Sequence, residues 1–161
     1  MTTINTIFDS SRHDLINKWL RLVLEGHDFT LTNLAADAGA RRYFRITLPN
    51  EASLVLMDAP VAHNDAKQFT SIAHLLASNG IHVPRVVHAN FEDGLRLLSD
   101  LGDETYLSSL KSENANQLFD DATTALVKMQ TIDDVSLLSK YDAALMNQEL
   151  TLFNDWYIQK Q

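Results

Sequence analysis

Hydrophobic positions recur along the chain at two different periods, and the change of period predicts where helices and strands lie. Spacing of three and four residues predicts a helix over residues 11–25, ended by Gly26, and another over residues 64–79, ended by Gly80. The same spacing predicts three further helices, over residues 104–111, 114–130 and 141–158.

Between the first two helices and after the second, the apolar residues alternate or form short runs, which is the pattern of β-strands. Residues 29–34, 41–48 and 53–59 predict a three-stranded antiparallel meander. Residues 85–91 and 94–101 predict a hairpin that turns at Glu92-Asp93-Gly94, because Asp-Gly favours a tight turn.

The second predicted strand carries three arginines, which alternation places on different faces. Successive side chains of a strand point to opposite sides of the sheet. Arg42, Phe44, Ile46 and Leu48 therefore share one face, and Arg41, Tyr43, Arg45 and Thr47 share the other. We expect the first face to pack inward and the second to be polar and aromatic.

The order of elements predicts an α+β fold. A helix, three strands, a helix and two strands give a five-stranded antiparallel sheet with one helix inserted between the third and fourth strands, which is the small lobe of the protein-kinase-like fold. Strand signals, charge and composition change together at residues 99–102. We therefore expect a nucleotide-binding small lobe over residues 1–101, and over residues 102–161 the first helices of a truncated large lobe.

Composition and charge narrow the class of function. The chain has 161 residues, no cysteine and a formal net charge of -8, and residues 102–161 carry 4 Lys/Arg against 10 Asp/Glu. An acidic surface disfavours nucleic acid and anionic membranes as partners. The first residues lack the features of a signal peptide, and no apolar run is long enough to cross a membrane, so we expect a cytoplasmic protein.

The arginine cluster is the local feature most suited to chemistry. Arg41, Arg42 and Arg45 follow the small-residue turn Ala38-Gly39-Ala40, where backbone amides and guanidinium groups could hold a phosphate. The alternative is that these arginines form ion pairs with Asp37, Glu51 or Asp58. No histidine pair has the spacing of helical metal ligands, and no metal site is predicted.

Four longer segments resemble a known family. AADAGARRYFRITL, SLVLMDAP, LLSDLGDETY and YDAALMNQELTLFNDWY are similar, in this order and spacing, to the N-terminal part of the aminoglycoside-phosphotransferase-like kinases. Within that family they most resemble the bacterial amino-sugar kinases of cell-wall recycling. The resemblance covers residues 29–158. It implies an ATP-dependent phosphotransferase whose acceptor is the anomeric hydroxyl of an amino sugar.

The resemblance also implies roles for particular residues. Residues 36–42, including Asp37, Ala38, Gly39, Ala40, Arg41 and Arg42, would form the loop over the ATP phosphates. Ser99, Asp100 and Leu101 would form the hinge whose backbone groups bind adenine. Leu31, Phe44, Val55 and Leu98 are candidates for apolar walls around the base, with core packing as the alternative.

The sequence departs from the general kinase pattern, in which a lysine on the third strand pairs with a glutamate on the following helix. Met57 occupies the lysine position, and the helix over residues 64–79 contains no glutamate, with Gln68 as the nearest candidate. We hypothesise that Arg42 or Arg45 supplies the charge for the phosphates instead.

The catalytic residues and Mg²⁺ ligands of this family are expected in the large lobe, after the end of this chain. We therefore expect the chain alone to be inactive as a kinase and to self-associate through its C-terminal helices, whose apolar stripes would lack a partner. Two other functions stay open at this point. One is a non-catalytic kinase-like binding or regulatory module, and the other is an aminoglycoside phosphotransferase.

Overall fold

The structure, a computed structural model, describes residues 10–34, 41–50, 52–59, 66–133, 136, 138 and 140–159. The chain divides into two compact units, residues 1–131 and residues 132–161. The expected boundary between residues 101 and 102 falls inside the first unit. The division into a small lobe and the beginning of a large lobe therefore stays a prediction.

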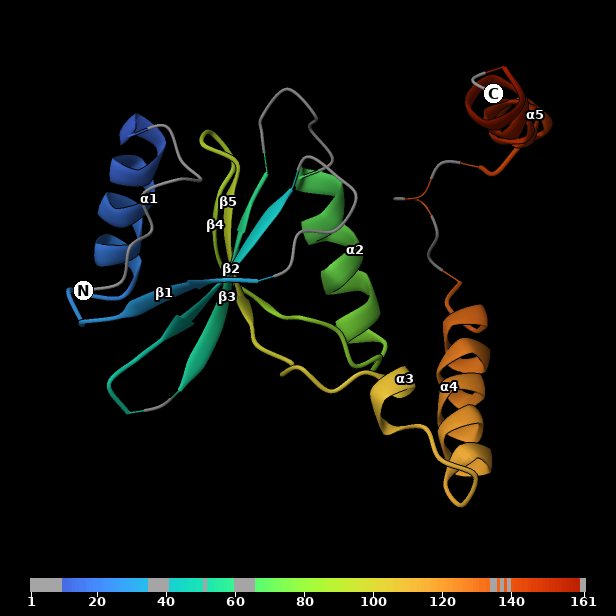
Figure 1. Ribbon diagram of the computed structural model, residues 1–161, viewed down its shortest axis with the longest axis horizontal. Helices are drawn as coiled ribbons and strands as arrows, with labels where there is room; N and C mark the ends of the chain where they lie inside the picture. The colour runs from blue at the N-terminus through green and yellow to red at the C-terminus, as the bar shows by residue number, and fades with distance from the viewer. Residues whose placement is uncertain are drawn as a thin grey trace. The chain divides into compact units, whose positions relative to one another are not determined.

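The first unit is built on one antiparallel sheet of five strands (Figure 1). Its strands are β1 (Thr30–Asn33), β2 (Arg42–Thr47), β3 (Ser53–Asp58), β4 (Val86–Asn90) and β5 (Leu95–Ser99). Their order in the sheet is β1-β2-β3-β5-β4, and every neighbouring pair is antiparallel. The predicted meander and hairpin are both confirmed.

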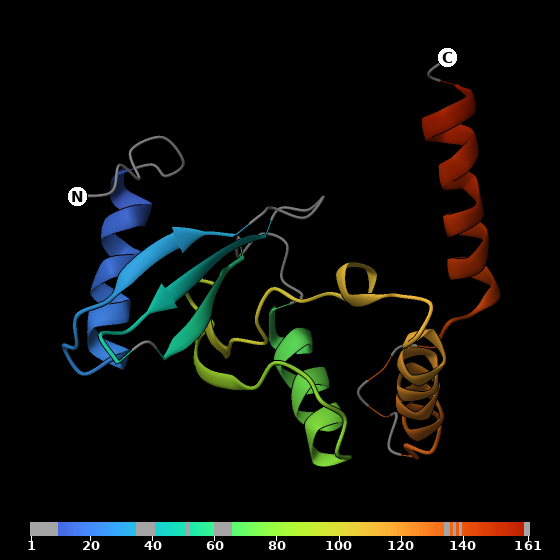
Figure 2. The same cartoon turned by 60° about the horizontal axis from the view of Figure 1, so that its bottom comes forward.

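Among the described residues, four helices belong to the same unit: α1 (Ser10–Val23), α2 (Ala66–Ser78), α3 (Tyr106–Ser109) and α4 (Ala115–Gln130). Helix α2 lies between β3 and β4 in the chain, as the sequence predicts. Helices α1 and α2 lie on opposite sides of the sheet (Figures 1 and 2). The two faces of the sheet therefore have different surroundings.

Among the glycines with backbone angles that L side chains rarely take, Gly80 and Gly94 lie at turns between elements. Gly94, with φ 70°, completes the turn between β4 and β5 at the predicted Asp-Gly position. Gly80, with φ 69°, follows α2, and its carbonyl accepts a hydrogen bond of 2.8 Å from Lys128 Nζ of α4. A Cβ at Gly80 would approach that nitrogen to 2.6 Å, so the lysine side chain would have to shift to make room for one.

The hydrophobic core lies between α1 and the sheet. Ile16 and Leu20 of α1 are fully buried against side chains of four strands. Those strand residues are Leu31, Phe44, Ile46, Leu56, Leu95 and Leu97. The inward-facing side of β2 is thus the side of Phe44 and Ile46, as the alternation predicts. Burial of these apolar side chains holds α1 on this face.

The second unit contains α5 (Ala143–Leu152), which continues into a π-helical segment, η2 (Phe153–Ile158). The side chain of Asp142 caps α5 by accepting a hydrogen bond of 3.0 Å from the backbone N–H of Leu145. The rings of Phe153 and Tyr157 stack with their centroids 5.1 Å apart. The helix predicted over residues 141–158 is therefore present, and its last turn is wider than an α-helical turn. Six large apolar or aromatic side chains of α5 and η2 are each more than half exposed: Leu150, Leu152, Phe153, Trp156, Tyr157 and Ile158.

Across the part of the chain that the structure describes, no helix has the length and apolar character needed to span a lipid bilayer.

Candidate functional site

The side of the sheet that faces α2 differs in chemistry from the side that faces α1. Strand pairing places two rows of side chains on it, each running across β2, β3 and β5. One row is Arg45, Val55 and Leu98, and the other is Tyr43, Met57 and Arg96. We call these six residues the α2 face. It combines apolar side chains with two arginines, whereas the α1 face is mostly a hydrophobic core.

Val55 and Leu98 lie directly opposite each other on β3 and β5. Both therefore point to the α2 face, where the sequence analysis expects the walls of a base-binding site. Leu31 and Phe44 lie on the other face and are buried in the core against α1. The expectation for this second pair is corrected, because residues on opposite faces of a sheet cannot line one site. Core packing accounts for both.

Arg45 reaches from β2 to the segment that follows β5. Its Nε donates to Asp100 Oδ2 at 2.6 Å and its Nη2 to Asp100 Oδ1 at 3.1 Å, so the pair is bidentate. Its Nη1 also donates to Asp103 Oδ2 at 2.6 Å. Hydrogen bonding to Arg45 is the main reason why the pKa of Asp100 falls from 3.8 to about 2, with the Gly102 backbone N–H contributing. We call Arg45, Asp100 and Asp103 the hinge cluster.

The proposed hinge itself is held at its first two residues. The Ser99 backbone N–H donates to the Arg85 carbonyl at 2.9 Å, and the Arg85 backbone N–H donates to Ser99 Oγ at 2.9 Å. Asp100 is fixed by Arg45. Leu101 is half exposed, and within the described residues nothing hydrogen-bonds its backbone N–H or C=O. Leu101 therefore offers main-chain groups to a ligand.

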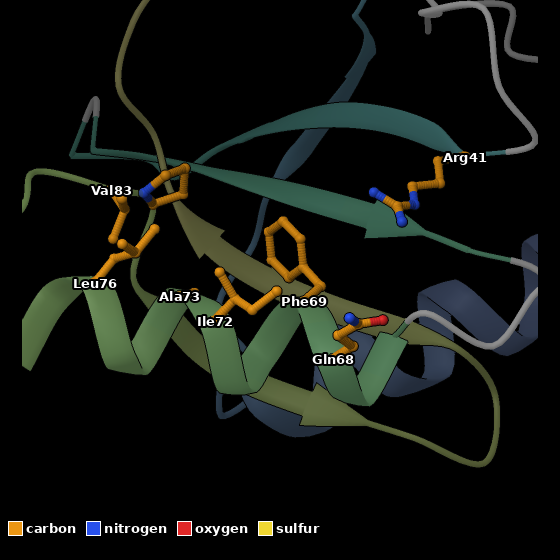
Figure 3. Close-up of a pocket in the computed structure, with 8 residues that line it drawn as sticks. Arg41, Gln68, Phe69, Ile72, Ala73, Leu76 and Val83 are labelled. Atoms are coloured by element: carbon orange, nitrogen blue, oxygen red, sulfur yellow. The ribbon is translucent and has the colours of Figure 1, made fainter. Parts of the chain in front are cut away.

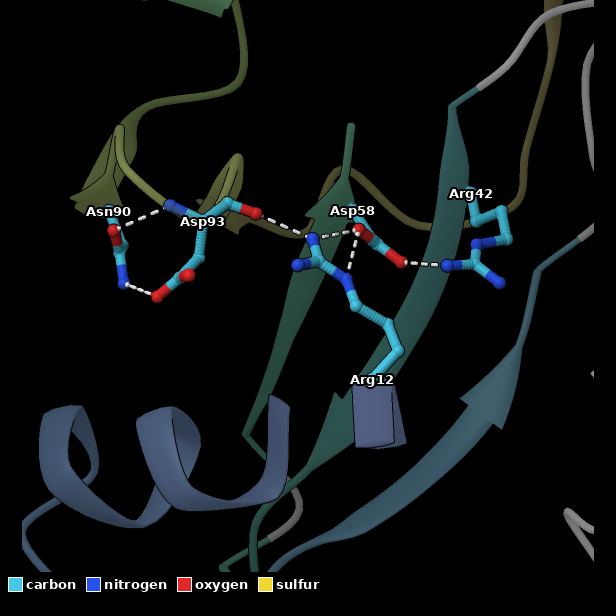
Figure 4. Close-up of polar contacts among 5 residues, drawn as sticks. All are labelled: Arg12, Arg42, Asp58, Asn90 and Asp93. Carbon is cyan, nitrogen blue, oxygen red and sulfur yellow. Dashed lines mark hydrogen bonds and ion pairs between the residues drawn. The ribbon is translucent and has the colours of Figure 1, made fainter. Parts of the chain in front are cut away.

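Arg42 points to the α1 face, as its place in β2 predicts. Its Nη2 donates to Asp58 Oδ2 at 2.5 Å, while Arg12 Nη2 of α1 donates to Asp58 Oδ1 at 2.6 Å. The same Arg12 nitrogen donates to the Asp93 carbonyl at 2.5 Å, at the β4–β5 turn (Figure 4). Arg12, Arg42 and Asp58 form the α1-side cluster, which ties α1 to β2, β3 and this turn. The Arg42–Asp58 pair was one of the two alternatives for the arginine cluster.

Arg96 is the one charged side chain, among the described residues, with no exposed surface. Its Nε donates to Thr70 Oγ1 of α2 at 3.4 Å, and its guanidinium carbon lies 5.1 Å from the centre of the Phe91 ring. Burial lowers the pKa of Arg96, and the charge of Arg41 lowers it further. Sequence reasoning missed this residue, although a charged residue inside the apolar run of β5 was an available signal.

A cavity of about 330 Å³ lies beside α2. Figure 3 shows Phe69, Ile72 and Leu76 of α2 along its floor, with Arg41 and Gln68 toward one end. Gln68 is the residue nearest the missing glutamate, so the structure brings it to the same cavity as Arg41. The cavity is otherwise apolar, lined also by Ala73, Val83 and Pro84.

The remaining predicted site residues are of two kinds. Asp37, Ala38, Gly39 and Ala40, the proposed phosphate loop, lie outside the described residues. Met57 is fully buried at its place on β3, next to Arg96. Nowhere in the described ranges do three His, Asp or Glu side chains gather in a way that could hold a metal ion.

This arrangement of sheet and helices defines the class of protein as the small lobe of the kinase-like phosphotransferase fold. A solved structure from Ralstonia eutropha, described as an aminoglycoside phosphotransferase, aligns with a TM-score of 0.60. The alignment covers 92% of this chain and 48% of that chain at 14% identity, so it concerns the fold alone.

Sequence comparison then identifies the family. Residues 30–161 match the phosphotransferase enzyme family, and the chain belongs to it. A relative from Pseudomonas aeruginosa is 41% identical over 93% of this chain, and one from Neisseria meningitidis is 34% identical over 91%. Both are named N-acetylmuramate/N-acetylglucosamine kinase. The chain spans less than half the length of these relatives, 47% and 44%.

Proposed function

We propose that this chain is the nucleotide-binding part of an ATP-dependent kinase that phosphorylates amino sugars recycled from the cell wall in the cytoplasm. The observation that carries the proposal is the similarity, over more than nine-tenths of the chain, to relatives named N-acetylmuramate/N-acetylglucosamine kinase. The α2 face and the hinge give this similarity a physical basis.

The adenine base would lie against the α2 face near the hinge. Val55 is partly exposed there beside the buried Leu98, and Leu101 would provide main-chain hydrogen-bonding groups within a few residues. Apolar walls with a few convergent polar groups are the usual composition of a small-molecule site. Ser99 and Asp100 would fix the path of the hinge rather than bind the base through their side chains, because both side chains already have partners.

The phosphates would lie toward the loop before β2. The proposed contacts are Asp37, Ala38, Gly39, Ala40, Arg41 and Arg45. Arg42 and Met57 stay predictions of the sequence analysis alone, because Arg42 points to the α1 face and Met57 is fully buried. The proposal is supported by Arg41, which lines the cavity beside α2 and carries a positive charge there. In phosphoryl transfer the protein mainly positions the nucleotide and stabilises charge, and Mg²⁺ bridges phosphate oxygens. We assign no Mg²⁺ ligand among the described residues.

Calorimetry tests the proposal directly. Titration of the purified chain with ATP and Mg²⁺ is expected to show weak binding, stronger than the binding of adenosine. Incubation with labelled ATP and N-acetylglucosamine is expected to give no sugar phosphate, because the chain contains no recognisable catalytic loop. Absence of any nucleotide binding would refute the proposal, and turnover by the chain alone would refute its expected inactivity.

A non-catalytic binding module is the second candidate, and one observation favours it. Met57 is buried at the position where kinases carry a lysine, and α2 offers no glutamate. Joining the remaining part of the longer Pseudomonas aeruginosa relative to residue 161 and repeating the same assay separates the two functions. Sugar phosphorylation by the longer protein supports the kinase, and nucleotide binding without turnover supports the module.

We also propose that the chain pairs with a second copy of itself through its second unit. Leu150, Phe153 and Trp156 are 74%, 61% and 65% exposed, an unusual concentration of large apolar side chains on α5 and η2. Contiguous exposed apolar surface of this kind favours association. Sedimentation velocity is expected to show a mass that rises with concentration, and Phe153→Ser with Trp156→Ser to abolish the rise. A monomer at all concentrations would contradict this.

A further inference from the structure

The α2 face contains a buried positive charge next to the position at which kinases carry their lysine. Met57 of β3 and Arg96 of β5 are directly paired across the sheet. Paired residues on neighbouring strands lie about 5 Å apart and point to the same face. A guanidinium group on β5 can therefore occupy much of the space that a lysine on β3 would reach.

The surroundings of Arg96 hold its side chain in one place. The Thr70 hydroxyl of α2 accepts a hydrogen bond from Nε, and the Phe91 ring covers the guanidinium group. A hydroxyl orients the guanidinium without removing its charge, and the aromatic face attracts a cation. Thr70 thus stands on the helix that carries the lysine-orienting glutamate in kinases, and it contacts the cation from that helix.

A buried charge of this kind is costly for a sheet that could have used an apolar residue. Taking a guanidinium group out of water is unfavourable, and replacing a buried ionic group by apolar side chains often stabilises a protein. The other buried residues of β5, Leu95, Leu97 and Leu98, are all apolar. The charge of Arg41, a second cation, acts on Arg96, and Arg41 lines the cavity beside α2. Two cations on one side of a sheet favour an anionic ligand.

We propose that Arg96 supplies, from β5, the fixed positive charge that the kinase pattern places on the third strand, and that this charge favours the phosphates of a nucleotide on the α2 face. The inference rests on the proposed function. Arg96 is a positioning residue in this account. It acts through the electrostatic potential of the site, which a low-dielectric interior strengthens.

The test compares ATP with adenosine, because adenosine shares the base and lacks the phosphates. Calorimetric affinities for both ligands are measured with the unmodified protein, Arg96→Met, Arg96→Lys and the double variant Met57→Lys/Arg96→Met. Arg21→Met is the matched control, since Arg21 is exposed on α1. Thermal unfolding without ligand reports whether each variant is folded.

We expect Arg96→Met to weaken ATP binding about tenfold, the scale of one charged interaction, and to leave adenosine binding unchanged. Arg96→Lys should keep most of the preference for ATP. The double variant returns the charge to β3 and should recover part of the preference that Arg96→Met loses. Arg21→Met should bind both ligands as the unmodified protein does.

Two results would overturn the inference while leaving the proposed function intact. One is a preference for ATP that survives in Arg96→Met, and the other is an equal loss of affinity for both ligands, which a purely structural role predicts. An unmodified protein that binds neither ligand would instead refute the proposed function and this inference with it. If Arg96→Met does not fold, the inference is tested on the unmodified protein through the NMR resonance of the Arg96 Nε–Hε group. That resonance should shift with ATP and not with adenosine, and an identical response to both would overturn the inference.

Discussion

Two arginines only three positions apart on β2, Arg42 and Arg45, belong to different clusters. Arg42 lies on the α1 side, where it shares the buried carboxylate of Asp58 with Arg12. Arg45 lies on the α2 side, where it binds Asp100 and the mostly exposed Asp103. Both residues are arginines of the same short strand, and only the alternation of side chains along β2 puts them on opposite faces of the sheet.

The difference between the clusters lies in what each one joins. The α1-side cluster links a helix to three strands around an acid that is 1% exposed, so its loss would leave charges inside the fold. The hinge cluster links β2 to the segment after β5, at the edge of the proposed nucleotide site. We therefore expect the first cluster to govern stability and the second to govern ligand binding.

The largest expected effect is that of Asp58→Ala. Removing the carboxylate leaves Arg12 and Arg42 facing each other without their shared partner, and breaking a buried pair in this way costs about 3 kcal/mol. Asp103→Ala is the matched control, and loss of an exposed ion pair should cost under about 1 kcal/mol. Urea denaturation measures both free energies of unfolding. Equal losses for the two variants would show that burial does not distinguish the clusters.

A smaller effect is expected on nucleotide affinity. Arg45→Ala should weaken ATP binding by about fivefold, in the range of one charged hydrogen bond partly offset by solvent. Arg42→Ala should weaken it less, because Arg42 points to the α1 side, and should lower the free energy of unfolding more. Calorimetry with ATP and urea denaturation of both variants provide the comparison. The hypothesis that either arginine supports the phosphates fails if neither variant changes affinity.

The sequence was sufficient for the elements and for their order. Alternation in β2 predicted which face each arginine would take, and Asp93-Gly94 predicted the hairpin turn, because both depend on local backbone preferences. The sequence did not predict the ties between Arg12 and Asp58 or between Arg45 and Asp100, which join residues 46 and 55 positions apart. Such contacts depend on the order of strands in the sheet and on where α1 packs.

The residues of the proposed site were harder to predict from the sequence, because their positions also depend on strand order and on where α1 packs. Leu31 and Phe44 have the apolar character expected of walls around the base, but α1 covers their face of the sheet. Arg96 was overlooked because its importance comes from its cross-strand neighbour Met57, which is 39 positions earlier in the chain. The phosphate loop around Gly39 lies outside the described residues, so its role stays a prediction.

The smallest effect expected from the comparison is a dependence of stability on pH that belongs to the hinge cluster. Hydrogen bonding to Arg45 lowers the pKa of Asp100 from 3.8 to about 2 in the folded protein. The folded state then binds fewer protons than the unfolded state, so this contribution is complete above pH 3.8 and is lost as the pH falls toward 2. Asp100→Asn removes the titrating group. The difference in free energy of unfolding between the unmodified protein and this variant should therefore shrink from pH 4.5 to pH 2.5.

Repeating the Asp100→Asn comparison in a protein that also carries Arg45→Met tests whether Arg45 causes this dependence of stability on pH. In Arg45→Met the main cause of the lowered Asp100 pKa is gone, so the Asp100→Asn difference should change much less over the same pH range. A difference that narrows equally in both backgrounds would mean that the Gly102 N–H or another group, rather than Arg45, sets the pKa of Asp100. The hinge cluster would then lack the coupling between β2 and the hinge that distinguishes it from the α1-side cluster.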